Sequence, residues 1–317
     1  MARIIVPDDY PPVMTGSRGE ARLRELGEVA IHPSNCEGPE ELLRRVEDAE
    51  AIVNIRARCR FDADFFSQAE KLEILSIWGT GTDHVDLAAA KEADVVVSNT
   101  PGVAAHSVAE HTLALMLAAA RQIPENDAAV KRGEWPRGQM TQLRGKTLGL
   151  IGLGAIGRQT ARLARGIGMN LIAWTFHPDD AFAEEVGIEW VDLDALYERS
   201  DVVSLHVRHS PDTEGMVGKE AFSKMKRGAI LVNTARGPIV DEAALVRALG
   251  EGALASAGLD VFGEEPLPEG HPLSKLPNAV LSPHNAGVTP EVTEAGLLMA
   301  AENVAAYFEG NPRNVVN

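Results

Sequence analysis

The stretch Leu148-Gly-Leu-Ile-Gly152-Leu-Gly154-Ala-Ile-Gly157 decides the fold of this chain. Its glycines have the spacing G-x-G-x-x-G, they follow an apolar run typical of a strand, and they open a helical pattern rich in Ala, Arg and Leu. In that setting Gly152 allows a tight turn, Gly154 lets the backbone approach a pyrophosphate, and Gly157 lets the helix pack close to the strand. The motif therefore predicts a domain that binds a dinucleotide.

Short apolar runs alternate with helical patterns on both sides of this motif, as is typical of βαβ units on a parallel sheet. Before it we expect strands at Arg3–Pro7, Ala51–Ile55, Leu72–Ile77 and Val95–Ser98, and helices at Pro39–Ala49 and Asp62–Ala69. From it onward we expect strands at Thr147–Ile151, Asn170–Trp174, Val202–Leu205, Ala229–Val232, Ala257–Asp260 and Ala279–Leu281, with helices that start near Ala155, Leu193, Lys219 and Asp241. Two doubly wound α/β domains are implied.

The order of these elements also predicts where the domains divide. The long apolar stretch Ser107–Ala120 separates the two series of strands. The last helical run, Pro290–Phe308, follows the final strand and is long enough to pack back on the first domain. We therefore expect two Rossmann-like or flavodoxin-like parallel-sheet domains, a discontinuous one of residues 1–98 and 288–317 and a dinucleotide-binding one of residues 99–287.

The composition describes a folded, acidic chain. Its 317 residues favour two domains, and its formal net charge of -16 argues against a nucleic-acid partner, because phosphate backbones are bound by clustered Lys and Arg. The longest apolar runs are shorter than the about 20 residues that a membrane span needs. Cys36 and Cys59 form no metal-ligand cluster or disulfide framework, and the N-terminal sequence has no signal-peptide pattern. We expect a cytoplasmic protein with no membrane span and no catalytic metal.

The second strand of the dinucleotide-binding domain ends without the usual acidic residue. A dinucleotide fold places Asp or Glu at this point to bind the ribose hydroxyls, but this chain has Thr175. The 2′-phosphate of NADP would favour Arg or Lys, yet none lies between Arg165 and Arg199, and Asp179 would repel a phosphate. We expect NAD, and NADP stays open because Thr175 and His177 can both donate hydrogen bonds.

Three ionisable residues follow later strands, where open α/β sheets gather their ligands. Arg236 can offer two donors to a substrate carboxylate or polarise a keto oxygen. His284 can donate a proton to a developing alkoxide and recover it in the reverse direction. Glu265, if hydrogen-bonded to His284, would favour the imidazolium form. Each residue taken alone also fits a structural role in a connecting loop.

Further segments of the chain resemble one known family. The segments Ile77-Trp-Gly-Thr-Gly-Thr-Asp-His-Val-Asp86, Asn99-Thr-Pro-Gly and Ser107-Val-Ala-Glu-His-Thr112, together with those above, resemble the D-isomer-specific 2-hydroxyacid dehydrogenases over nearly the whole length. The resemblance implies a split substrate domain, a Rossmann-type cofactor domain and an Arg/Glu/His catalytic set that matches Arg236, Glu265 and His284. Within the family, the chain is similar to glyoxylate or hydroxypyruvate reductases and to phosphoglycerate dehydrogenases.

The resemblance also implies binding residues. Asp260 matches the carboxylate that meets the nicotinamide carboxamide, and the backbone amides of Thr80 and Gly81 match the loop that binds the substrate carboxylate. Arg56 and Arg58 are expected to add positive charge for the substrate, although they equally fit the exposed end of a strand. We expect the cofactor to be bound by Gly152, Gly154, Ala155, Ile156, Gly157, Thr175, Thr234 and Asp260.

The resemblance thus predicts an NAD(P)-dependent oxidoreductase that interconverts a D-2-hydroxy acid and its 2-keto acid by hydride transfer. Glyoxylate, hydroxypyruvate or a related keto acid is the expected substrate, and phosphoglycerate oxidation stays open because Arg56 and Arg58 could meet a phosphate. The resemblance further suggests a homodimer with Gln122–Leu143 as an exchange arm. An alternative of another class is a nucleotide-sensing binding protein, similar to the corepressors that share this fold.

Overall fold

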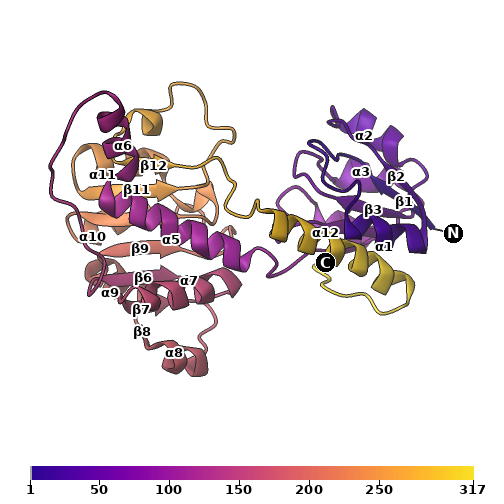
Figure 1. Cartoon of the computed structure of the whole chain (residues 1–317). Helices are drawn as coiled ribbons and strands as arrows, with labels where there is room; N and C mark the ends of the chain where they lie inside the picture. The colour runs from indigo at the N-terminus through magenta and orange to yellow at the C-terminus, as the bar shows by residue number, and fades with distance from the viewer. Residues whose placement is uncertain (1) are drawn as a thin grey trace. The chain divides into compact units, whose positions relative to one another are not determined.

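The computed structural model describes residues 2–317 and divides into two compact units (Figure 1). One unit runs to Ala104 and resumes from Val288 to Asn317, and the other is Ala105–Gly287. The first boundary differs from the expected one by residues 99–104. Asn99 N donates to Asn314 O at 3.1 Å and Thr100 N donates to Gly79 O at 2.9 Å, so this segment is hydrogen-bonded within the first unit.

The first unit is built on a five-stranded parallel sheet with the strand order β2-β1-β3-β4-β5. Its strands are β1 (Ala2–Val6), β2 (Gly27–Ile31), β3 (Ala51–Asn54), β4 (Ile74–Ile77) and β5 (Val96–Ser98). Its helices are α1 (Arg18–Leu26), α2 (Pro39–Val46), α3 (Ala63–Gln68), α4 (Leu87–Glu92) and α12 (Pro290–Phe308). Because β3 and β4 are parallel neighbours, the loops that follow them, with Arg56 and Thr80, lie at one edge of this sheet.

The second unit is built on a seven-stranded parallel sheet with the order β12-β11-β10-β9-β6-β7-β8. Its strands are β6 (Thr147–Ile151), β7 (Asn170–Trp174), β8 (Ile188–Trp190), β9 (Val202–Leu205), β10 (Ala229–Asn233), β11 (Leu254–Leu259) and β12 (Ala279–Leu281). Its helices are α5 (Ala105–Arg121), α6 (Ile123–Lys131), α7 (Ala155–Gly166), α8 (Asp180–Val186), α9 (Leu193–Arg199), α10 (Lys219–Lys224), α11 (Glu242–Gly250) and the short η1 (Gly237–Ile239) and η2 (Pro272–Lys275). The strand order reverses beside β6, which is the point where such sheets bind their ligands.

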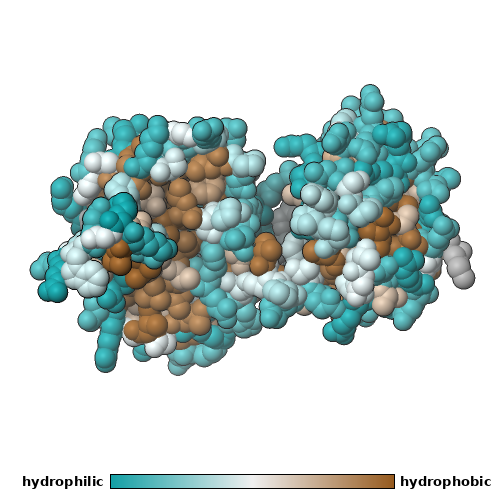
Figure 2. Space-filling model, turned by 45° about the horizontal axis from the view of Figure 1, so that its top comes forward, coloured by the Kyte–Doolittle hydropathy of each residue, from teal (hydrophilic) through white to brown (hydrophobic). Residues whose placement is uncertain are grey.

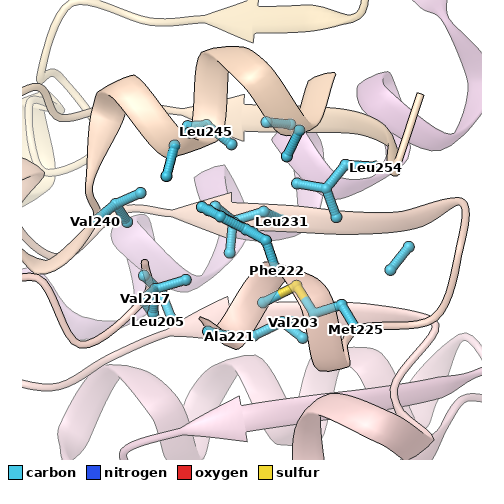
Figure 3. Close-up of a cluster of buried hydrophobic side chains, with 14 of the residues drawn as sticks. Val203, Leu205, Val217, Ala221, Phe222, Met225, Leu231, Val240, Leu245 and Leu254 are labelled. Carbon is cyan, nitrogen blue, oxygen red and sulfur yellow. The ribbon is translucent and has the colours of Figure 1, made fainter. Parts of the chain in front are cut away.

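Hydrophobic cores lie on both faces of the seven-stranded sheet. On one face, strand residues such as Val203 and Leu231 pack against Phe222 of α10, Met225 at the C-cap of α10 and Leu245 of α11 (Figure 3). On the other face, α5, α7 and α8 pack against the same sheet through a second cluster. Burial of one large apolar side chain contributes about 1.5–3 kcal/mol, so both layers stabilise the sheet. The expected fold of two doubly wound parallel-sheet α/β domains is confirmed.

Two edge strands, β2 and β8, are not predicted by the sequence pattern. In each, one residue alone is buried, Val29 in β2 and Ile188 in β8. An edge strand with a single buried side chain produces no apolar run, and hydrophobic periodicity therefore gives no signal for it. The remaining strands of both sheets lie within a few residues of their expected positions.

One surface of the second unit is apolar. Figure 2 shows hydrophobic residues gathered on the face of the Ala105–Gly287 unit that is turned toward the viewer. The exposed large hydrophobic side chains of α5, α6 and the segment that follows are Leu117, Ile123, Val130, Trp135 and Met140. Trp135 is 73% exposed, which is unusual for so large an apolar side chain. Among residues 2–317, no helix has the length and apolar character needed to cross a bilayer.

Candidate active site

The glycine loop between β6 and α7 has the geometry that its sequence predicts. Gly152 has a φ of +97°, and a Cβ there would lie 2.7 Å from the backbone of His206, so both the conformation and the space require glycine. A Cβ on Gly157 would clash with the carbonyl oxygen of Gly152. At Gly154 a Cβ would meet nothing within 4 Å. The loop is therefore closely packed at Gly152 and Gly157 and open at Gly154.

The first turn of α7 is open to an anion. Gly154 is the N-cap of this 12-residue helix and provides no side-chain cap for its first amides, and Ala155 at its start is exposed. Uncapped amides and the positive end of the helix dipole attract a phosphate group. The open space above Gly154, together with the uncapped amides of Ala155 and Ile156, fits the pyrophosphate of a dinucleotide.

The ribose side of this loop holds an ion pair that the sequence pattern does not reveal. Thr175 directly follows β7, as expected, and is half-buried. Nη2 of Arg158, in the first turn of α7, lies 2.8 Å from Oδ2 of Asp179, the N-cap of α8. The amide of Phe182 and then the guanidinium of Arg158 lower the pKa of Asp179. Arg158 belongs to the helix before β7 and therefore lies outside the segment between Arg165 and Arg199, in which the sequence has no Arg or Lys.

His284 and Glu265 form a close pair in the same unit. Nδ1 of His284 lies 2.6 Å from Oε2 of Glu265, and Oε1 of Glu265 accepts a hydrogen bond from the amide of Phe262 at 2.9 Å. His284 has a φ of 51°, a left-handed conformation that turns the chain sharply after β12. Its side chain is 46% exposed, so the ring is supported on one side and accessible on the other.

Arg236 joins this pair. Burial by itself would raise the pKa of Glu265, but the hydrogen bonds from His284 and from the Phe262 amide, with the charges of His284 and Arg236, outweigh burial and lower it. The backbone of Arg236 is held by Asn233, whose side chain donates to Arg236 O at 2.9 Å and accepts from Ala235 N at 3.0 Å. The structure thus brings together Arg236, Glu265 and His284, as the sequence predicts.

The loop that carries His284 is fastened by residues that sequence reasoning did not assign to it. Asp260 is 1% exposed, and its two oxygens accept from Asn285 N at 3.1 Å and from Ala286 N at 3.0 Å. Ser107 of α5 donates to Ala286 O at 2.7 Å. His111 Nε2 lies 3.0 Å from Ser282 Oγ and 3.4 Å from Asp260 Oδ1. Ser107 and His111 lie in the segment Ser107–Thr112 that resembles the family, but the sequence does not indicate that they contact the His284 loop.

Two residues expected to bind the cofactor already have protein partners. Thr234 is 8% exposed, and its hydroxyl lies 2.8 Å from the Thr112 hydroxyl of α5. Asp260 uses both oxygens to fix the His284 loop, although a carboxylate oxygen accepts more than one hydrogen bond. Contacts of either residue to a cofactor therefore stay a prediction.

The expected substrate residues lie in the first unit, where the two arginines are engaged. Arg58 contacts the fully buried Asp8 (Nε to Oδ2 3.2 Å, Nη2 to Oδ1 2.9 Å) and donates to Tyr10 O at 2.7 Å. Arg56 donates to Pro11 O at 2.7 Å. Both guanidinium groups therefore hold the loop that follows β1. These contacts use donors that would otherwise be available to a substrate.

The loop after β4 keeps its amides available. Gly79, with a φ of 125°, donates its amide to Thr100 Oγ1 at 2.7 Å, and Thr80 O accepts from Asn99 Nδ2 at 2.8 Å. Within the described part of the chain, the amides of Thr80 and Gly81 have no acceptor. This loop can therefore offer two adjacent N–H donors to an anion, as expected for a carboxylate-binding nest.

The chain is similar to known proteins over most of its length. The family model "D-isomer specific 2-hydroxyacid dehydrogenase, NAD binding domain" matches residues 113–286. A D-3-phosphoglycerate dehydrogenase of Methanocaldococcus jannaschii is 42% identical over 299 residues, which are 93% of this chain and 56% of that protein. A glyoxylate reductase of Korarchaeum cryptofilum is 38% identical over 323 residues, which are 99% of this chain and 96% of that protein.

A solved structure shares the whole fold. The crystal structure of a glyoxylate reductase from Paecilomyes thermophila has a TM-score of 0.90 at 31% identity and covers 99% of this chain and 98% of that one. The chain spans about half the length of the phosphoglycerate dehydrogenases that it matches and nearly the full length of the two glyoxylate reductases named above. The chain belongs to the D-isomer specific 2-hydroxyacid dehydrogenase family, and residues 113–286 form the NAD binding domain of that family.

Proposed function

We propose that this protein interconverts a D-2-hydroxy acid and its 2-keto acid with a nicotinamide dinucleotide as hydride carrier. The observation that carries the proposal is the 2.6 Å contact between His284 and Glu265, with the charge of Arg236 beside it. This group stands at the carboxyl ends of parallel strands in the unit that also holds the glycine loop. A proton carrier, an orienting carboxylate and a guanidinium are the groups that reduction of a keto acid requires.

The arrangement supports a distinct role for each side chain. A nicotinamide dinucleotide, when bound, would supply or accept the hydride. Because Nδ1 of His284 is engaged with Glu265, Nε2 is the nitrogen that delivers a proton to the keto oxygen and recovers it in the reverse direction. The Glu265 carboxylate stabilises the imidazolium and holds the ring. Arg236 carries five N–H donors, so its bond to Ala235 O at 2.7 Å is compatible with binding the substrate carboxylate and polarising the keto oxygen.

The first unit supports a small substrate without a phosphate group. We assign the substrate carboxylate to the amides of Thr80 and Gly81, which have no acceptor among residues 2–317. Arg56 and Arg58 add positive charge, but Asp8 neutralises part of it and the carbonyls of Tyr10 and Pro11 occupy donors. A phosphate would compete with these contacts. Glyoxylate or hydroxypyruvate is therefore our preferred substrate, in line with the relatives named glyoxylate reductase.

The experiment is a cofactor oxidation assay on the purified chain. NADH and NADPH are each tested against glyoxylate, hydroxypyruvate, pyruvate and phenylpyruvate, and NAD is tested with D-3-phosphoglycerate. We expect turnover of glyoxylate or hydroxypyruvate, with His284→Asn as the control for contaminating activity. Turnover of D-3-phosphoglycerate alone would overturn the substrate proposal. Binding of the cofactor without turnover of any acid would overturn the enzymatic proposal and favour a nucleotide-sensing protein.

We further propose that the protein is a homodimer and that the segment Gln122–Leu143 forms the contact. The exposed side chains of Ile123, Val130, Trp135 and Met140 support this proposal, because water-exposed apolar groups of this size favour a covering partner. Light scattering is expected to give twice the chain mass of 33.9 kDa, and a monomeric mass would contradict it.

We also propose that the protein is cytoplasmic. Cys36 and Cys59 are free thiols, which suits a reducing compartment. Cell fractionation followed by detection of the chain tests this proposal, and recovery outside the cytoplasmic fraction would contradict it.

A further inference from the structure

Arg158 connects the two segments that surround the ribose in a dinucleotide fold. Its Nε donates to Leu153 O at 3.2 Å, inside the glycine loop. Its Nη2 lies 2.8 Å from Oδ2 of Asp179, in the loop that follows Thr175 and β7. The guanidinium carbon stacks 4.7 Å above the ring of Phe182. The cation therefore lies between the turn that approaches the pyrophosphate and the strand end that meets the ribose hydroxyls.

A second ion pair on the same helix separates the contact between two helices from the contact with the glycine loop. Arg162, one turn later on α7, stacks 4.9 Å above the same Phe182 ring and contacts Glu185 at 3.0 Å. This pair joins α7 to α8, and among residues 2–317 its side-chain hydrogen bonds run only between Arg162 and Glu185 and not to the glycine loop or the end of β7. Arg162 with Glu185 thus reproduces the helix-to-helix contact of Arg158 with Asp179 away from the cofactor loop. It provides a matched control.

We propose that Arg158 is the cation that meets the 2′-phosphate of NADP, and that Asp179 weakens this contact by pairing with the guanidinium and repelling the phosphate. The ion pair then makes the chain select NAD, a task that Thr175 cannot perform because its hydroxyl neither repels nor neutralises a phosphate. This inference rests on the proposed function only in requiring that the chain binds a nicotinamide dinucleotide. It is independent of the substrate.

The exposure of the pair allows an exchange of partners. The side chains of Arg158 and Asp179 are 35% and 40% exposed, and ion pairs at such positions are weak. A phosphate carries more charge than a carboxylate and accepts a bidentate guanidinium, so it can replace Asp179 as the partner. The carboxylate of Asp179 remains close by and opposes the phosphate. A substitution that removes the charge of Asp179 and keeps the shape of its side chain should therefore raise the affinity for NADPH relative to that for NADH.

The test measures binding of NADH and NADPH by nicotinamide fluorescence, without any substrate. Asp179→Asn is the informative variant, because Asn keeps the N-cap bond that Asp179 Oδ1 accepts from Phe182 N at 3.1 Å and removes only the charge. We expect wild type to bind NADH more tightly than NADPH. In Asp179→Asn the affinity for NADPH rises by about fivefold, while that for NADH changes by less than about twofold. In Arg158→Gln the affinity for NADPH falls by about fivefold and that for NADH is nearly unchanged.

Three comparisons decide the outcome. Glu185→Gln and Arg162→Gln, the matched controls, are expected to leave the NADPH-to-NADH ratio unchanged, and an equal effect of Glu185→Gln would overturn the proposal. The double variant Arg158→Gln/Asp179→Asn is expected to lose the NADPH gain of the single variant. An Asp179→Asn protein that folds, binds NADH and keeps the wild-type ratio also overturns the inference but leaves the proposed function intact. Binding of neither nucleotide by wild type overturns both.

Discussion

His284 and His206 both follow strands at the carboxyl edge of one sheet, yet their surroundings differ in every respect that matters for proton transfer. His284 is about half exposed and contacts a carboxylate. His206 directly follows β9, donates its amide to Ile151 O at 2.7 Å and places Nε2 at 2.9 Å from Ser204 Oγ. Desolvation lowers the pKa of His206 to about 3, so this ring stays neutral at physiological pH. Position at a strand end therefore does not make a histidine a proton carrier. Proton transfer also needs a carboxylate partner and an accessible ring, and of these two histidines only His284 has both.

The largest effect is expected from His284→Asn. Loss of the proton carrier should lower kcat by about 100- to 10,000-fold, which is the usual contribution of general acid-base catalysis. Asn tolerates the left-handed φ of 51° at this position, so the fold should persist. Steady-state turnover measures the loss of kcat, and an unchanged affinity for NADH shows that the fold persists. Turnover within about tenfold of wild type would remove His284 from the reaction and end the contrast with His206.

Glu265→Gln should lower kcat by a smaller factor, about 10- to 100-fold, because the imidazole remains and loses only its charged partner. The native contacts lower the pKa of Glu265, so the stability that its carboxylate contributes is present above the ordinary carboxylate range and is lost as pH falls through the lowered value. The Tm difference between wild type and Glu265→Gln should therefore be constant near neutral pH and shrink in acid. A Tm difference that grows in acid would contradict this assignment.

His206→Gln should affect stability more than turnover. Because the folded chain disfavours the charged ring, the unfolded state binds more protons between pH 6.5 and about 3, and stability is lost as pH falls through this window. The slope is at most about 1.4 kcal/mol per pH unit and should disappear in the variant. Denaturant unfolding of both proteins at neutral pH and in mild acid measures it. If His206→Gln lowered kcat as much as His284→Asn does, both histidines would take part in the reaction and the contrast between them would be wrong.

The same contrast applies to the arginines at strand ends. Arg236 stands beside Glu265 and His284, where sequence reasoning places it. Arg56 and Arg58 are partly occupied by Pro11, Tyr10 and Asp8, which sequence reasoning does not predict. Asp8 follows β1 and is separated from Arg58 by 50 residues of sequence. A buried acidic residue produces no local sequence pattern that identifies its partner. Local sequence shows which residue types stand at the edge, and packing selects their partners.

The sequence by itself determined the dinucleotide loop, the two parallel sheets and the identity of the proposed catalytic residues, because glycine spacing and apolar runs are local features that act through backbone conformation and burial. Only the tertiary structure decided which charges meet. The contact of His284 with Glu265 spans 19 residues and the tether from Asp260 to the His284 loop spans 25 and 26. Arg158 meets Asp179 across two helices of the same sheet face. Such pairs depend on how the helices and strands pack, because a side chain's electrostatic partner is set by distance in space and not by separation along the chain.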